Sequence, residues 1–136
     1  MANTPPVNRN AIWYVRRSTA GAIPAGRGVV LTGSFGADGA ALIAPPAGAD
    51  ARISGVTFEQ DPDDADVGLM LQAGLSNVQV RLGTAGVSFG DPLRVQDATG
   101  VWETAPGGSS NAYYYALQTK AAGTLCWAAP IASRPV

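Results

Sequence analysis

The sequence predicts an all-β protein, a compact small β-sandwich or barrel with at most one short helix and an extended N-terminal arm. Short apolar runs bounded by Gly, Pro, Asp or Asn recur about every 8 to 12 residues, a spacing typical of strands in sandwiches and barrels. No stretch of about 12 residues keeps a helical apolar period free of glycine. The 17 glycines and 10 prolines supply turns, while a hydrophobic content of 46% is too high for a disordered chain.

The expected strands follow one another between these turn signals. The first, AIWYVRR (11–17), comes after a proline-bearing start and is expected to be an extended arm or an edge strand. The others are GVVLTG (28–33), AALIAP (40–45), ARISGVTF (51–58), VGLMLQAG (67–74), NVQVRLG (77–83), PLRVQ (92–96), VWET (101–104), AYYYALQ (112–118) and GTLCWAAPI (123–131). At 136 residues the chain has the length of one domain, so we expect an arm over residues 1–20 and a single β-rich domain over 21–136.

Two segments show the two-residue period of a strand with one buried face. In NVQVRLG, the apolar Val78, Val80 and Leu82 alternate with polar residues, and Leu93 and Val95 alternate in the same way in PLRVQ. These five side chains are therefore expected in the core.

The connections between strands are predicted from their turn residues. VGLMLQAG and NVQVRLG are expected to pair as a hairpin across GLSN, and DATG is expected to turn the chain into VWET. The one short helix is expected near TKAAG (119–123).

The segment GVSFG (86–90) fits G-x-S-x-G, the strand-to-helix elbow that exposes a catalytic serine in many hydrolases. A serine needs a neighbouring base to take its proton, yet the chain has no histidine and its only lysine is Lys120. Pro92 also opposes the helix that should follow Ser88. We therefore expect no enzyme activity, and we interpret the segment as a turn between strands.

The acidic run DPDDAD (61–66) is the candidate metal loop, because clustered carboxylates favour calcium. The EF-hand frame fails at three positions, which hold Ala65, Asp66 and Gln72. We expect a solvated acidic loop, with a weak calcium site as the alternative. The sequence contains no zinc-ligand cluster and no Walker spacing, so no metal or cofactor is expected.

The remaining composition signals narrow the class of protein further. Cys126 lies in the apolar run TLCWAA and is expected to be a buried, inert thiol.

The start MANTPPVNRN lacks a secretory pattern, and no run approaches the length of a transmembrane helix, so we expect a soluble product made in a cytosol, without membrane contact. Only nine basic residues are scattered along the chain, so no nucleic-acid partner is expected.

The charges are distributed unevenly although the net charge is only -1. Residues 1–37 hold four arginines and no acid, whereas residues 38–66 hold seven acids and one arginine. This asymmetry suggests that the first segment contacts an acidic surface, on a partner or on a neighbouring copy of the chain. The alternative is that these arginines are simply solvated.

Three tryptophans and the triplet Tyr113, Tyr114 and Tyr115 are candidate stacking platforms for sugars. Strand alternation should point Tyr114 to one side and its two neighbours to the other. Part of the triplet is therefore expected in the core or at a subunit interface. Carbohydrate binding through Trp102 and the tyrosines is the alternative.

The second half of the chain resembles the head decoration, or capsid cement, proteins of tailed bacteriophages, of the lambda type. The resemblance rests on motifs over about residues 52–131: a GVT strand, an AG step into an alternating strand, VSFGDPL, DATGVW, and YAL followed by an alanine-rich step to AG. Residues 1–50 match less well.

This resemblance implies a small β-tulip-like fold that assembles as a homotrimer on the outer face of the virion head. Such a protein is synthesised in the host cytoplasm, binds the major capsid protein and stabilises the shell by bridging its subunits. The resemblance also implies a capsid-binding N-terminal arm, whose residues here would be Arg9, Ile12, Trp13, Tyr14, Val15, Arg16 and Arg17. A virion-surface carbohydrate-binding β module is the alternative function.

Overall fold

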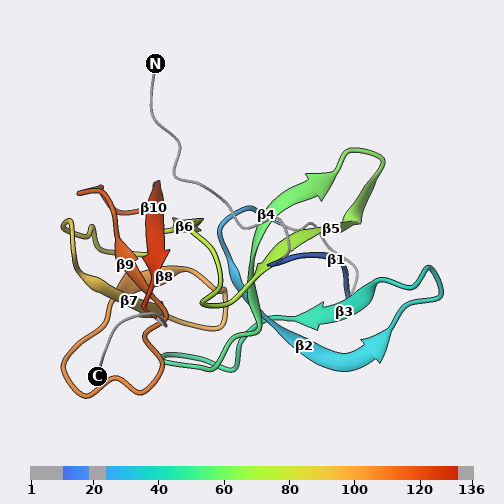
Figure 1. The fold of residues 1–136 in the computed structure, drawn as a ribbon, viewed down its shortest axis with the longest axis horizontal. Helices are drawn as coiled ribbons and strands as arrows, with labels where there is room; N and C mark the ends of the chain where they lie inside the picture. The colour runs from blue at the N-terminus through green and yellow to red at the C-terminus, as the bar shows by residue number, and fades with distance from the viewer. Residues whose placement is uncertain (1–10, 19–23, 132–136) are drawn as a thin grey trace.

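The computed structural model describes residues 11–18 and 24–131, which form two five-stranded sheets (Figure 1). In chain order the strands are β1 (Ile12–Arg17), β2 (Gly28–Phe35), β3 (Ala41–Ala44), β4 (Gly55–Asp61), β5 (Asp64–Gln72), β6 (Val78–Arg81), β7 (Pro92–Val95), β8 (Trp102–Thr104), β9 (Tyr114–Ala116) and β10 (Leu125–Pro130). Each lies within or overlaps a predicted strand segment, so the all-β prediction is confirmed.

The first five strands close into a barrel in the order β1-β3-β2-β4-β5. β1 is parallel to β3 and antiparallel to β5, and Val15 pairs with Ala41 on one side and Gly68 on the other. Because both edges of β1 are paired within the chain, the expectation that residues 12–17 belong to a free arm or an edge strand is wrong. Residues 1–10 and 19–20, the rest of the predicted arm, lie outside the described residues.

The last five strands form a second sheet in the order β6-β10-β9-β7-β8. Its two outer strands are brought together where Leu82, just after β6, bridges Trp102 at the start of β8. The backbone amide of Gly83 donates to the carbonyl oxygen of Trp102 at 2.8 Å. This bridge partly satisfies the backbone groups that an open sheet edge would expose for pairing with other chains.

Two clusters of buried side chains hold the fold. The smaller cluster belongs to the barrel and consists of Val15, Val29, Ala41, Ile43 and Met70. The larger cluster joins Val56 and Leu71 of the barrel to the inner side chains of the second sheet, including Trp102 and Tyr114. Met70 and Leu71 are consecutive residues of β5, and each packs in a different cluster. This strand is therefore buried on both faces, which explains why it is apolar at successive positions.

Two tyrosine hydroxyls of the second sheet accept hydrogen bonds from the backbone just before β4 and just after β5 of the barrel. Tyr113 Oη accepts a hydrogen bond from the amide of Ile53 at 3.2 Å, and Tyr114 Oη accepts one from the amide of Gly74 at 3.0 Å. The aromatic ring of Tyr114 remains fully buried. The two sheets therefore share polar as well as apolar contacts.

The predicted hairpin across GLSN is wrong. β5 pairs with β1 and β4 inside the barrel, whereas β6 pairs with β10 in the second sheet. Glycine and small polar residues at 74–77 carry the chain from one sheet to the other, and Tyr114 anchors that crossing. A turn signal between two strands does not reveal whether they remain neighbours, because pairing is decided by burial on both faces.

The predicted helix near TKAAG is also not formed. Lys120 instead pairs with Val87, each backbone amide donating to the other residue's carbonyl oxygen at 3.0 and 2.9 Å. The chain then turns at Gly123, whose φ of 75° lies in the left-handed region. This long-range backbone pairing overrides a weak local preference for helix.

The predicted turn at GVSFGDP is confirmed. The amide of Asp91 donates to the carbonyl of Ser88 at 3.0 Å, and Gly90 has a φ of 88°. The flanking residues do not pair with each other, so the turn is not the corner of a simple hairpin. Strand β7 follows at Pro92 instead of a helix, and the hydrolase elbow is therefore not formed.

Gly100, in the predicted DATG turn between β7 and β8, has a close backbone neighbour. Its φ is 81°, and an added Cβ would lie 2.5 Å from the carbonyl oxygen of Gly28. We expect Gly100→Ala to lower the free energy of unfolding by about 2 kcal/mol or more, because the substitution adds both strain and a clash. Gly107→Ala is the matched control, since no atom lies within 4 Å of its added Cβ. Equal urea midpoints for the two variants would contradict this assignment.

Candidate interaction surface

The predicted arm residues of β1 divide between the barrel interior and its surface. Val15 is fully buried, whereas Trp13 and Tyr14 are 36% and 48% exposed. Ile12 is half-buried and packs against the larger cluster. Arg9 lies outside the described residues. Arg16 and Arg17 are partly exposed. The two aromatic rings are therefore the most exposed side chains of β1.

Arg16 is paired within the chain. Its Nη2 atom lies 2.9 Å from Asp38 Oδ2 and 3.0 Å from Asp64 Oδ2. The hydrogen bond that Arg16 donates to Asp38, followed by the one that it donates to Asp64, raises the pKa of Arg16, and the guanidinium in turn lowers the pKa of Asp38. The acidic surface that the charge asymmetry predicted for the first segment is thus, for Arg16, supplied by the β2–β3 turn and by β5 of the same chain.

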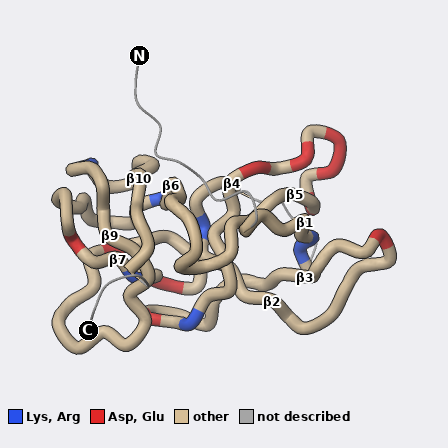
Figure 2. Tube along the Cα trace, in the orientation of Figure 1, with Lys and Arg blue, Asp and Glu red and all other residues tan. Residues whose placement is uncertain are grey.

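The exposed face of Tyr14 borders a groove beside the β4–β5 hairpin. The groove has a volume of about 190 Å³, and its walls include Glu59, Asp61, Pro62 and Leu69. Acidic residues are concentrated along this hairpin (Figure 2). An aromatic face next to two carboxylates suits a lysine or arginine side chain from another molecule. Among the described residues, no group of three or more His, Cys, Asp or Glu side chains is arranged to hold a metal ion.

The ring of Trp13 lies outside this groove, because Trp13 pairs with the buried Met70 on the opposite face of β1. We call the groove the Tyr14 surface. Sequence reasoning missed it because Tyr14 and Glu59 are far apart in the chain and meet only through the barrel. In the structure Tyr14 pairs with Leu69 across β1 and β5, and Leu69 in turn pairs with Glu59 across β5 and β4. The acidic run and the aromatic strand were both visible in the sequence. Their adjacency follows from strand register.

The tyrosine triplet alternates as predicted. Tyr114 is buried in the core, and its burial raises the pKa of its hydroxyl to about 12. Tyr113 and Tyr115 are half-buried. Tyr114 is therefore a core residue, and of the three tyrosines only its two neighbours retain surface for a subunit interface.

The aromatic platform predicted for carbohydrate binding is not accessible at Trp102. This side chain is fully buried, and its ring meets that of Tyr114 edge to face, with centroids 5.5 Å apart and planes at 75°. Trp102 therefore cannot stack on a sugar in the folded protein. Trp127 is half-buried and borders a shallow depression of about 130 Å³.

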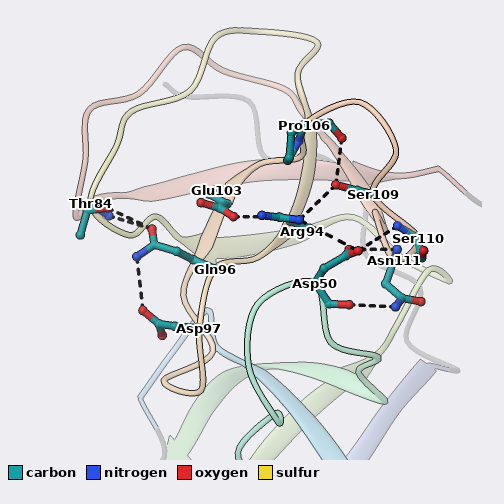
Figure 3. A network of polar contacts seen from close by, with 10 residues as sticks. All are labelled: Asp50, Thr84, Arg94, Gln96, Asp97, Glu103, Pro106, Ser109, Ser110 and Asn111. Atoms are coloured by element: carbon teal, nitrogen blue, oxygen red, sulfur yellow. Dashed lines mark hydrogen bonds and ion pairs between the residues drawn. The ribbon is translucent and has the colours of Figure 1, made fainter.

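A polar network holds the linker that follows the barrel strand β3 against the second sheet (Figure 3). Asp50 accepts hydrogen bonds from the backbone amides of Ser110 and Asn111 at 2.9 and 3.0 Å. Arg94 Nε donates to Glu103 at 2.7 Å, and its Nη1 atom lies 4.0 Å from Asp50. Asp50 has a φ of 54°, a left-handed conformation that aspartate tolerates better than most residues.

This network predicts acid sensitivity. The amide of Ser110 is the largest cause that holds the pKa of Asp50 below its ordinary value of 3.8, and Asn111 and Arg94 add to it. A lowered pKa in the folded state means that Asp50 stabilises the fold above its unfolded-state pKa, and this contribution is lost as the pH falls through the folded value. We expect Asp50→Asn to flatten the decline of the urea midpoint below about pH 4.

Asp63→Asn, at the exposed tip of the β4–β5 hairpin, is the control for this titration. It should leave the acid decline close to that of the unaltered protein. If Asp50→Asn retained the same slope as the control, Asp50 would not be the titrating group.

The other singled-out residues are structural. Cys126 is buried, as predicted, and burial raises the pKa of its thiol. The amide of Ser88 donates to Asp91 Oδ2 at 2.9 Å, so this turn is closed by its own side chains. In the described parts of the chain, no helix is long and apolar enough to cross a membrane.

Comparison with known proteins gives one informative result. No protein-family model matches the chain, and no curated protein sequence matches it. A solved structure shares its fold. The N base of head fiber gp8.5 of bacteriophage phi29 matches with a TM-score of 0.63 and 20% identity, over 88% of this chain and 92% of that chain. At this identity the likeness shows the fold alone.

Proposed function

We propose that this protein is a structural component of a tailed-bacteriophage head, located on the outer face of the virion. The observation that carries this proposal is the shared fold with the phi29 head fiber base, which extends over nearly all of both chains. The motif resemblance to head decoration proteins over about residues 52–131 supports the same class. The role is attachment to the shell, and no chemical reaction is assigned.

The finer proposal is that the protein acts as cement by bridging subunits of the major capsid protein. The Tyr14 surface supplies the contact, because it combines the exposed ring of Tyr14 with nearby carboxylates. Tyr14 lies on β1, a barrel strand that is paired at both edges. A rigid strand loses less conformational entropy on docking than a free arm does. The complementary patch on the capsid protein would carry a lysine or arginine beside apolar side chains.

A homotrimer is the proposed assembly, because three copies around a threefold position close their contacts without leaving an open interface. Tyr113 and Tyr115 are the proposed subunit contacts. Light scattering on the purified protein measures the mass directly, and a monomer at micromolar concentration would contradict a trimer that forms before docking.

The docking surface is tested with heads that lack this protein. The variant Tyr14→Ala should bind such heads at least about tenfold more weakly, because aromatic side chains contribute most of the energy at typical interfaces. Phe89→Ala is the matched control, since Phe89 is the most exposed aromatic residue outside the barrel at 71%. Cosedimentation measures occupancy, and circular dichroism checks the fold. Equal occupancy for both variants would place the contact elsewhere.

A further inference from the structure

The turn that joins β2 to β3 contains the only aspartate–glycine step of the sequence, Asp38–Gly39. This hairpin projects from the rest of the barrel (Figure 1), and both residues of the step are exposed. Gly39 has a φ of 84°, and no atom lies within 4 Å of the Cβ that another residue would add. The peptide amide after Asp38 is therefore not shielded by a side chain, which makes it a candidate nucleophile toward the neighbouring carboxyl group.

Such an attack would rearrange the backbone with no reagent other than water. The Gly39 amide nitrogen bonds to Cγ of Asp38, and a carboxyl oxygen leaves as one water molecule that carries away the amide proton and the carboxyl proton. The product is a succinimide ring. Water that then adds at Cγ restores aspartate, whereas water that adds at the main-chain carbonyl carbon leaves Gly39 bonded to Cγ, which is isoaspartate. No electrons are transferred, and isoaspartate has the mass of the original residue.

The contacts of the carboxyl group oppose this reaction. Arg16 of β1 donates hydrogen bonds from Nε and Nη2 to Asp38 Oδ2 at 3.2 and 2.9 Å. The amide of Ala40 donates to Oδ1 at 3.1 Å, which folds the side chain back over the turn. The bonds from Arg16, followed by that from Ala40, lower the pKa of Asp38. The carboxylate is therefore held in its ionised form, from which an oxygen does not leave as water.

The nucleophile is held as well. The amide of Gly39 donates to the carbonyl oxygen of Gly36 at 3.0 Å, and the amide of Gly36 donates to the carbonyl oxygen of Ala40 at 2.8 Å. These bonds keep the Gly39 nitrogen within the turn. Of the two restraints, the turn is local to the hairpin, whereas the guanidinium comes from a distant strand and can be removed by one substitution.

We propose that Asp38 is a latent site of isoaspartate formation and that Arg16 is the side chain that holds the reaction back. Arg16 also lies 3.0 Å from Asp64 Oδ2, so it joins the β2–β3 turn to β5. Isoaspartate would add one methylene to the backbone of the turn and move the carboxylate away from Arg16, which would release this connection. The inference goes beyond the proposed role at the phage head and does not depend on it.

Ageing of the purified full chain tests the proposal. At about pH 5, roughly a tenth of an unpaired aspartate is protonated, so that an exposed aspartate–glycine step can react. Arg16→Gln should form isoaspartate at position 38 at least about fivefold faster than the unaltered protein, because the nearby positive charge is lost. Methylation by an isoaspartate methyltransferase measures the rate, and electron-transfer dissociation mass spectrometry locates the residue. Equal rates for the two proteins would overturn the proposal.

Two matched variants separate the charge of Arg16 from a general loosening of the hairpins. Asp64→Asn removes the other partner of Arg16 but leaves Arg16 on Asp38, so it should age like the unaltered protein. Arg16→Lys keeps the charge without the planar fork and should age at an intermediate rate. Circular dichroism before and after ageing checks that each variant is folded. If Asp64→Asn accelerated the reaction as much as Arg16→Gln, the role of Arg16 would be refuted.

A last variant tests the position of the site. Adding Asp38→Glu to Arg16→Gln lengthens the side chain by one methylene, which removes the route through a succinimide and should abolish the signal at position 38. The intermediate itself should appear in aged Arg16→Gln as a species lighter by one water molecule. Isoaspartate that accumulated in the double variant as fast as in Arg16→Gln would place the reaction elsewhere in the chain and overturn the site.

Discussion

Replacing Trp102 by alanine is expected to lower the free energy of unfolding by about 4 kcal/mol, the typical loss for a large aromatic residue removed from a core. Trp102 is fully buried in the larger cluster and packs edge to face on Tyr114. Urea unfolding followed by circular dichroism measures the change.

Two further variants test whether this loss of stability comes from the burial of the Trp102 ring. Trp102→Phe should be less destabilising, because Trp102 Nε1 has no hydrogen-bond partner among the described residues and most of the ring volume is kept. Trp13→Ala, at a ring that is 36% exposed, should cost less than Trp102→Ala. If Trp102→Ala unfolded at the same urea concentration as Trp13→Ala, the Trp102 side chain would be accessible to solvent. Carbohydrate binding through Trp102 would then again be an alternative function.

The second large effect is expected at Val15. Val15→Asn places an amide without partners in the centre of the barrel and should remove about 3 kcal/mol or more of stability. Tyr14→Asn is the matched control, because the same side chain is introduced one position away on the exposed face of β1 and should change stability by less than about 1 kcal/mol. Thermal melts of the two variants give the comparison. Equal melting temperatures would mean that β1 is not a barrel strand.

This result also bears on how a docking arm can be tested. Removing residues 1–18 would delete β1 and open the barrel, so that loss of head binding would follow from unfolding alone. Point changes at the exposed aromatic residues of β1 avoid this ambiguity. They alter the surface and leave the ladder of β1 intact.

The strands were largely predictable from the sequence because their signals are local. Val78, Val80 and Leu82 alternate with polar residues, and all three are buried as expected. The positive-φ glycine at position 100 closes the predicted turn into β8. Segments of this kind are specified by side-chain period and by backbone freedom, both of which can be read from a few neighbouring residues.

The arrangement of the strands was less predictable because it depends on distant partners. The sequence of β1 is compatible with an arm, and only its pairing with β3 and β5 makes it part of the barrel. Gly68, the β5 partner of Val15, illustrates the constraint, because an added Cβ would lie 2.2 Å from the carbonyl oxygen of Glu59. The Tyr14 surface likewise arises only when separate segments meet. The resemblance to lambda-type decoration proteins stays a prediction, whereas the fold is shared with the phi29 head fiber base.

The central claim is that the protein is held on a phage head as a structural component. Cryo-electron microscopy of DNA-filled virions from the phage that encodes the chain tests it most directly. The account predicts regular density on the outer face of the shell that fits the barrel and second sheet, with β1 directed toward the major capsid protein. Virions that lack the protein, in both the reconstruction and a protein mass analysis, would contradict it.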